Sequence, residues 1–132
     1  MIRLLAIFLA AFSSTVFAKE DFAKKPKVPA DALAIFVDDS YKLIKFKKID
    51  GLLISENCRK KNCLALEATL KKNPFPAAVQ TGLLNPAALY CASVGGINII
   101  AINDKSHEEN VCHFKDKSYI NSWDLFYSRF PK

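Results

Sequence analysis

The stretch that decides the fold begins at Asn85 and reads NPAALYCASVGG. Asn85 suits the N-cap of a helix, because its side-chain oxygen can accept hydrogen bonds from the free amides of the first turn. Pro86 follows at the first helical position, where its missing N–H costs nothing. Gly95 suits the left-handed residue that ends many helices. The pattern predicts a helix over about residues 86–94. Three of its residues are spaced to share one face: Ala87, Cys91 and Val94.

A hairpin and a second helix are expected after the glycine pair. Residues 97–102 read INIIAI, which is typical of a strand because it is rich in β-branched residues. The polar run 103–110 is predicted to be a loop, and 111–114 a return strand with Cys112 and Phe114 on one face. Asn121 can cap a last helix, whose apolar residues recur at i, i+3, i+4 and i+7: Trp123, Phe126, Tyr127 and Phe130. The expected unit is helix–β-hairpin–helix.

This unit resembles a small bacterial domain of unknown function that occurs in proteins described as haemolysins. The resemblance covers residues 85–131 and rests on the order and spacing of these residues: Asn85, Pro86, Ala87, Tyr90, Cys91, Gly95, Gly96, Cys112, Ile120, Trp123 and Leu125. It implies a cell-envelope location and structural roles for the motif residues, and it supplies no catalytic residues. Many members of this family carry a lipoprotein anchor or a further cysteine near the last helix, whereas residues 119–122 of this chain contain no cysteine.

The N-terminus has the features of a secretory signal peptide over residues 1–18. Arg3 supplies the positive charge, residues 4–12 form an apolar segment, and Val16-Phe17-Ala18 suits the cleavage site. The apolar segment is shorter than the roughly 20 residues of a transmembrane helix. The sequence therefore predicts a periplasmic or secreted protein that begins at Lys19 and has no transmembrane segment.

Residues 19–81 carry all the excess positive charge of the chain. Arg3 is the one charged residue of the signal peptide, so residues 19–132 have a net charge of +5, and from Gly82 onward five basic residues balance five acidic ones. We therefore divide the exported chain into a basic N-terminal region, 19–81, and a haemolysin-like domain, 82–132. Nucleic-acid binding is not expected of an exported protein, but weak contact with an anionic membrane surface through the basic region is possible.

The structure of residues 31–48 is ambiguous from sequence alone. A helix would align Leu33, Phe36, Val37, Tyr41 and Ile44 on one face, whereas strands at 34–37 and 43–49 fit the content of β-branched and aromatic residues. We favour the helix. Asp50-Gly51 indicates a turn before a short strand at 52–54, and residues 64–72 are strong helix formers that end at Asn73-Pro74.

All four cysteines lie in the exported part, where an even number indicates disulfides. We expect Cys91–Cys112, which joins the first helix to the return strand, and Cys58–Cys63, which closes a local loop. Crossed pairings are the alternative. Zinc binding by Cys58 and Cys63 with His107 and His113 is a weaker alternative, because a second metal-spaced pair is absent. Cys112 and His113 are neighbours in a strand and point to opposite faces, so they do not form a nucleophile–base pair.

The sequence therefore predicts an α+β protein, a small disulfide-stapled domain preceded by a small mixed or helical N-terminal subdomain. Motifs typical of hydrolases, metalloproteases and phosphate-binding loops are absent. No catalytic residue, metal ligand or cofactor is assigned. We expect a non-enzymatic binding or structural module that recognises an envelope protein or ligand. The alternatives are a secreted membrane-active factor and a small inhibitor of an envelope hydrolase.

Overall fold

The structure, a computed structural model, describes residues 25–58, 62–76 and 85–132. The predicted signal peptide lies outside these residues, and so does the expected domain boundary near residue 81. No helix in the described ranges has the length and apolar character that crossing a membrane requires.

Residues 31–48 form a β-hairpin, and the helix favoured from the sequence is wrong. Strand β1 spans Ala32–Val37 and β2 spans Ser40–Ile49. Asp38 and Asp39 form the two-residue loop with φ angles of 51° and 60°. Two positive φ angles are the geometry that joins twisted antiparallel strands without splaying them. The apolar residues that fitted a helical stripe are divided between the two faces of the strands, with Leu33 inward and Phe36 half exposed at 51%.

A second tight hairpin continues the sheet. Asp50 and Gly51 also have positive φ angles, 50° and 80°, and connect β2 to β3, Leu52–Ser55, as the turn signal predicted. Helix α1, Leu64–Leu70, follows the first disulfide. Its N-terminus is capped from a distant loop, because the N–H groups of Leu64 and Ala65 donate to Asp116 Oδ2 and Ser118 Oγ at 2.8 and 3.0 Å.

The C-terminal half contains two further helices and three strands. They are α2, Pro86–Ser93; β4, Ile97–Ile102; β5, Glu108–His113; β6, Tyr119–Asn121; and α3, Ser122–Arg129. Asn85 and Asn121 cap α2 and α3 as predicted, each accepting two backbone N–H bonds. Strand β5 begins at Glu108, within the run that we expected to be a loop, and β6 was not predicted.

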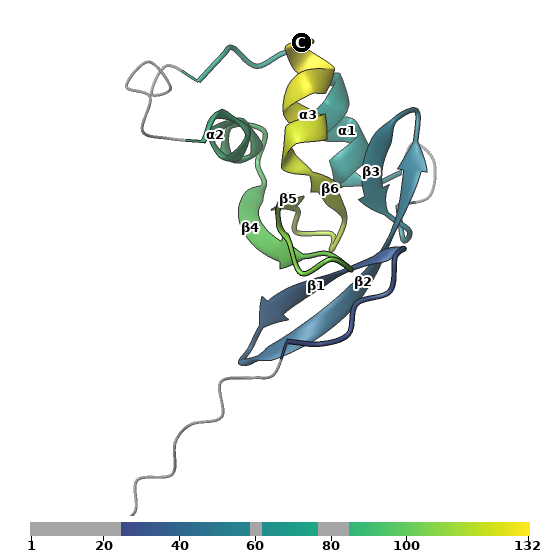
Figure 1. Ribbon diagram of the computed structural model, residues 1–132. Coiled ribbons are helices and arrows are strands. Elements are labelled where there is room, and N and C mark those ends of the chain that lie inside the picture. Colours follow the sequence, from purple (N-terminus) through teal and green to yellow (C-terminus); the bar gives the residue numbers. More distant parts are fainter. Residues whose placement is uncertain (1–24, 59–61, 77–84) are drawn as a thin grey trace, which may run out of the picture.

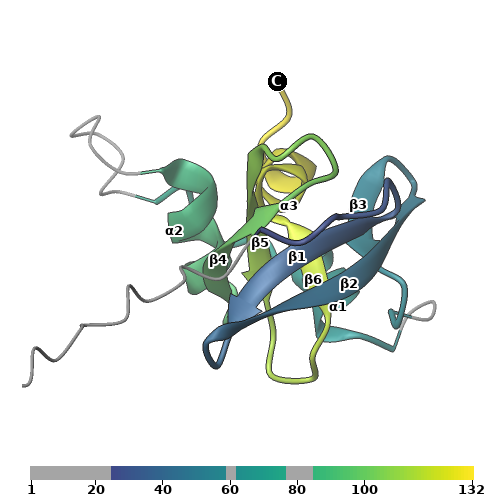
Figure 2. The ribbon, with the colours of Figure 1, turned by 60° about the horizontal axis from the view of Figure 1, so that its bottom comes forward.

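The six strands close into one antiparallel barrel in the order β1-β2-β3-β6-β5-β4. Figure 1 shows the three helices gathered on one side of the sheet, and Figure 2 shows β1 and β2 crossing the other side. The expected helix–hairpin–helix unit with a separate N-terminal subdomain is therefore wrong. The hairpin of β4 and β5 is part of the barrel and not a separate unit, because β4 pairs with β1 and β5 pairs with β6.

The barrel wall separates two apolar clusters. Inside the barrel, Leu33, Ile35, Phe46, Ala101 and Val111 are buried together. Outside, the helices cover residues of the alternate face, so Ile54, Cys112 and Ile120 pack against α1, α2 and α3. Strand alternation explains the division, because successive side chains point to opposite faces of the wall.

The Cys91–Cys112 disulfide fastens α2 to this outer face. Both cysteines are fully buried, and their Cα atoms are 5.6 Å apart. Gly96 lies against the bond: a Cβ atom there would overlap Cys112 Sγ and lie 2.9 Å from Cys91 Sγ. The second expected disulfide, Cys58–Cys63, is also present. Gly95, with φ of 92°, ends the helix in the left-handed conformation that the sequence predicted.

We expect loss of the Cys91–Cys112 bond to destabilise the protein more than loss of Cys58–Cys63. Replacing Cys91 and Cys112 by Ser should cost about 2–5 kcal/mol of unfolding free energy, the usual range for a small secreted domain. The Cys58→Ser, Cys63→Ser variant should cost less, because its loop of five residues constrains the unfolded chain less than one of 21. Urea unfolding of both variants measures the difference, and equal losses would contradict the expectation.

Candidate functional site

The barrel is closed firmly at one end of β3 and is open at the other. β3 pairs with β6 at a single position, Ile54 opposite Ile120. Two side chains strengthen that seam: Leu53 N–H donates to Asp124 Oδ2 at 2.8 Å, and Tyr119 N–H donates to Ser55 Oγ at 2.9 Å. The strand ends at Ser55, whereas β2 and the β5–β6 hairpin extend beyond it. The wall therefore divides at this end.

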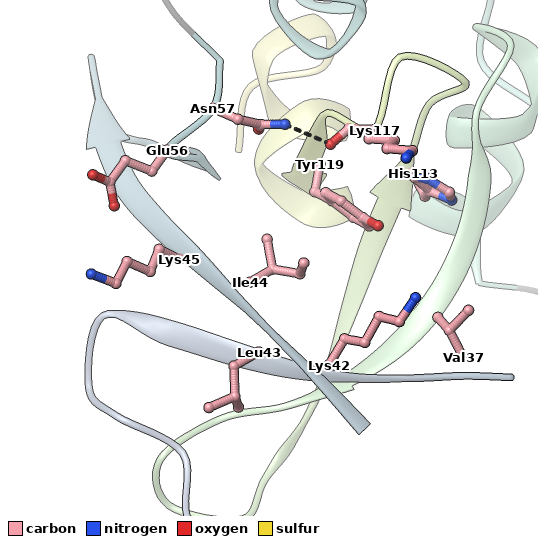
Figure 3. A pocket seen from close by; sticks show the side chains of 10 residues that line it. All are labelled: Val37, Lys42, Leu43, Ile44, Lys45, Glu56, Asn57, His113, Lys117 and Tyr119. Atoms are coloured by element: carbon pink, nitrogen blue, oxygen red, sulfur yellow. Dashed lines mark hydrogen bonds between the residues drawn. The ribbon is translucent and has the colours of Figure 1, made fainter. Parts of the chain in front are cut away.

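A cleft of about 500 Å³ lies where the wall divides. Figure 3 shows β2 along one side of it and the residues of the β5–β6 hairpin, His113, Lys117 and Tyr119, on the other. Glu56 and Asn57, which follow β3, lie at one end. The cleft thus combines residues that are far apart in the sequence.

Strand register places an apolar and aromatic surface in the cleft. Val37, Ile44 and Tyr119 pack beside the inner cluster and extend it to the open end. His113 pairs with Tyr119 across β5 and β6, and the two rings stack with centroids 4.5 Å apart and planes 9° from parallel. This stack forms a flat, half-buried wall that could contact an apolar or planar group.

Lysine side chains give the cleft a positive character. Lys42, Lys45 and Lys117 line it together with one acidic residue, Glu56. In Figure 3 Lys45 and Glu56 lie on the same side, whereas Lys42 and Lys117 lie nearer the stacked rings. The end of the cleft beside His113 and Tyr119 is therefore the part best suited to an anion.

Burial favours the uncharged form of both rings. It raises the pKa of Tyr119, whose hydroxyl is a hydrogen-bond donor. Burial also lowers the pKa of His113, while the nearby Asp116 carboxylate acts in the opposite direction more weakly. The positive charge of the cleft therefore comes from lysine, and the histidine provides a polar, uncharged surface.

The β5–β6 loop that carries Lys117 is held by several hydrogen bonds. Lys117 adopts a positive φ of 63°, and its carbonyl accepts a 2.9 Å bond from Asn57 Nδ2. Asp116 accepts from Leu64 N–H and from both the N–H and the hydroxyl of Ser118. Burial alone would raise the pKa of Asp116, but these bonds outweigh it and leave the pKa below its ordinary value. The loop is thus attached to α1 and positioned beside the cleft.

Of the residues singled out from the sequence, His113 lines the cleft, whereas the residues of the family pattern lie elsewhere and support the fold. Tyr90 is fully buried and donates its hydroxyl to Lys71 O at 3.1 Å, while its ring packs against Phe126 and Phe130. Trp123 stacks on Tyr127. Both disulfides belong to the helix-covered side of the barrel, where all four cysteines are buried in the outer cluster.

Sequence reasoning did not bring the cleft residues together, although one signal was present. In a strand, Lys42 shares a face with Ile44 and Phe46, so a lysine adjoins the apolar part of the inner face of β2, which also carries Ser40 and Lys48. Under the helix interpretation Lys42 fell on the polar face, where its one expected role was contact with an anionic membrane surface. A lysine on the buried face of a strand indicates either an open barrel end or a binding site.

The loop attachment predicts that Asp116→Asn destabilises the protein. The amide can accept fewer of the bonds now made to the carboxylate and carries no charge at the helix N-terminus. We expect a loss of about 1 kcal/mol, typical of a lost helix cap, measured by urea unfolding at pH 7. Because the folded pKa is depressed, the stabilisation should be present above the unfolded pKa and disappear as the pH falls through the folded one. Asp104→Asn, at an exposed loop position, is the control and should leave stability unchanged.

The ring of His113 should titrate below the pKa of histidine in an unstructured peptide. Its burial disfavours the charged form, so the stability that it contributes is full above the unfolded pKa and declines as the pH falls toward the folded one. Proton NMR of the imidazole would give the midpoint. Asp116→Asn should lower that midpoint further, because it removes a carboxylate that favours the imidazolium. A midpoint at or above the peptide value would contradict the assigned burial.

Comparison with known proteins identifies one part of the chain. Residues 82–129, somewhat more than a third of the sequence, match the model of a domain of unknown function, DUF333. The matched part contains β4, β5, β6, α2 and α3, whereas β1, β2, β3 and α1 precede it. Searches with the chain found no match among the curated proteins or among the solved structures. A small domain of unknown function is thus supported at residues 82–129.

Proposed function

We propose that this chain is an exported, non-enzymatic binding module whose site is the cleft at the open end of the barrel. The observation that carries the proposal is the composition of that cleft, in which three lysines and one glutamate surround an apolar and aromatic floor. Such a site suits a ligand with both an anionic group and an apolar or planar part. Ligand sites commonly combine an apolar lining with a small number of placed polar groups.

The residues of the cleft favour binding over catalysis. Among the described residues its lining contains neither serine nor cysteine, and all four cysteines are joined in disulfides. His113 stacks face to face on Tyr119, which leaves it in contact with an aromatic ring and not with a nucleophile. The pattern of residues 1–18 and the two disulfides support an exported protein of the cell envelope.

One argument for the membrane-active alternative is removed. A helix over residues 31–48 would have been basic and amphipathic, which suits membrane binding, but these residues form β1 and β2. The alternative now rests on the haemolysin description of the family that the chain resembles. The haemolysin-like function and the inhibitor alternative remain predictions without support from a specific contact in the described residues.

Anion binding to the purified protein, residues 19–132, tests the proposal. We expect benzoate to shift the NMR signals of Lys42, Lys117, His113 and Tyr119 in a saturable and salt-sensitive way, since exposed charges are screened by salt. Lys42→Glu combined with Lys117→Glu should weaken binding at least about tenfold, because the two reversals replace attraction by repulsion at both positions.

A charge-matched control distinguishes the site from a general effect of net charge. Lys72→Glu combined with Lys105→Glu changes the net charge equally at exposed positions outside the cleft. This variant should bind benzoate as the unmodified protein does. Equal weakening in both variants, or shifts that spread over all lysines, would count against the cleft as the site.

A further inference from the structure

The first half of β2 has a free edge. Residues 40–45 of this strand pair with β1 on one side. On the other side, pairing with β3 extends only from Phe46 opposite Ser55 to Ile49 opposite Leu52, with one further bond from Glu56 N–H to Lys45 O at 2.9 Å. Within the described ranges, residues 41–44 therefore have no strand partner on this side. Unpaired N–H and C=O groups along a strand edge form a template for another strand.

This free edge is one wall of the cleft. Four successive residues of β2, Lys42–Lys45, line the cleft, although successive side chains of a strand point to opposite faces. A run of consecutive residues means that the cleft borders the edge of the strand and not just one face. Figure 3 shows open space between this edge and Tyr119, on the side toward which Ile44 points. The cleft thus occupies the position that a longer β3 would fill.

The charges of the cleft indicate what could occupy the edge. The segment that precedes β1 is a poor candidate, because its Lys24, Lys25 and Lys27 would bring like charges to the cleft lysines. A second copy that paired through the same edge would bring its own Lys42 to this cleft, placing like charges together. An extended peptide with a negative end fits both the backbone and the charge.

We propose that the cleft binds an extended peptide that ends in a free carboxylate: the peptide adds as a strand to the edge of β2, and the carboxylate lies beside Lys42 and Lys117. This inference rests on the proposed function and names the ligand class of the same site. Strand addition of this kind takes affinity from main-chain hydrogen bonds and specificity from alternate side chains. Side chains on the inner side would contact Ile44 and Val37, so small apolar residues suit those positions.

Tyr119 gives the site a further donor for the carboxylate. Its hydroxyl, like any tyrosine hydroxyl, is protonated at neutral pH, and the ring stacks on His113. The edge of four residues, 41–44, would cover about 13 Å of peptide at roughly 3.3 Å per residue. The expected footprint is therefore about four residues, with the carboxylate at the end of the cleft where Lys42 and Lys117 lie.

Labelled peptides bound to the disulfide-bonded protein, residues 19–132, test the inference. The probe is a hexapeptide of alternating Thr and Val with a fluorophore at its N-terminus, made once with a free carboxylate and once with a terminal amide. Fluorescence anisotropy should show the free acid binding at least about tenfold more tightly, the factor expected for one charge-assisted hydrogen-bonded contact. Lys42→Gln should abolish that preference, whereas Lys105→Gln, at an exposed position outside the cleft, should retain it.

Backbone methylation of the probe tests strand addition without altering the protein. Alternate N–H groups of a strand point in opposite directions, so methylation of one alternate set should abolish binding and methylation of the other should preserve it. Binding should also protect the amides of Tyr41 and Leu43 from hydrogen exchange, because these residues point the same way as Lys45, whose carbonyl bonds to Glu56 on this side. The inference is overturned if both methylated peptides bind equally, if the acid and amide bind equally, or if sedimentation shows that the free edge pairs with a second copy.

The benzoate experiment distinguishes a failure of strand addition from a failure of the proposed anion site. If benzoate binds in the cleft and no peptide binds more tightly than benzoate, strand addition is wrong and the anion site stands. If neither benzoate nor the free-acid peptide binds, both proposals are overturned.

Discussion

β3 has four residues and its neighbour β2 has ten, and this mismatch shapes the rest of the molecule. The second half of β2 pairs with β3, which lets the sheet continue to β6 and close on itself. The first half has no such partner among the described residues. A seam with a single residue pair would be weak, but the Asp124 carboxylate and the Ser55 hydroxyl supply bonds that the short strand lacks. The short length of β3 therefore explains both how the barrel closes at β6 and why it is open beside the first half of β2.

The opening is not simply a gap in an apolar barrel, because its charges differ from those at the other end. There a smaller hollow of about 260 Å³ includes Asp31, Asp104 and Glu109 beside two lysines. At the open end, burial holds His113 neutral and the lysines carry the charge. Lysine suits this position because its long apolar stem can lie along Ile44 and Tyr119 while the ammonium group stays in water. The inner face of β2 can thus present a cation without burying it.

Local signals in the sequence predicted local structure well and the assembly poorly. Asn85 and Asn121 predicted both helix caps, Gly95 a helix end, and Asp50-Gly51 a hairpin turn, because each acts within a few residues. The turn at Asp38-Asp39 was missed for two reasons. Asp adopts positive φ less readily than Asn or Gly, and the spacing of the apolar residues on both sides fitted a helix that continued through the turn. The pairing of β3 with β6 joins residues more than 60 apart, and a strand of three residues has too few positions to show alternation. The cleft depends on that pairing, so the sequence indicated only the unexplained lysine at position 42.

The matched region of unknown function, residues 82–129, supplies only half of the barrel wall. Its three strands would expose the edge of β4 that β1 pairs with and the edge of β6 that β3 pairs with. Its inner face would also lose Leu33, Ile35 and Phe46, which bury Ala101 and Val111. The same division runs through the cleft, where Lys42 and Ile44 come from one side and His113, Lys117 and Tyr119 from the other. A cleft built in this way needs the residues that precede the matched region. A protein that shares the matched region but has a different β2 would therefore have a cleft with a different charge and a different free edge.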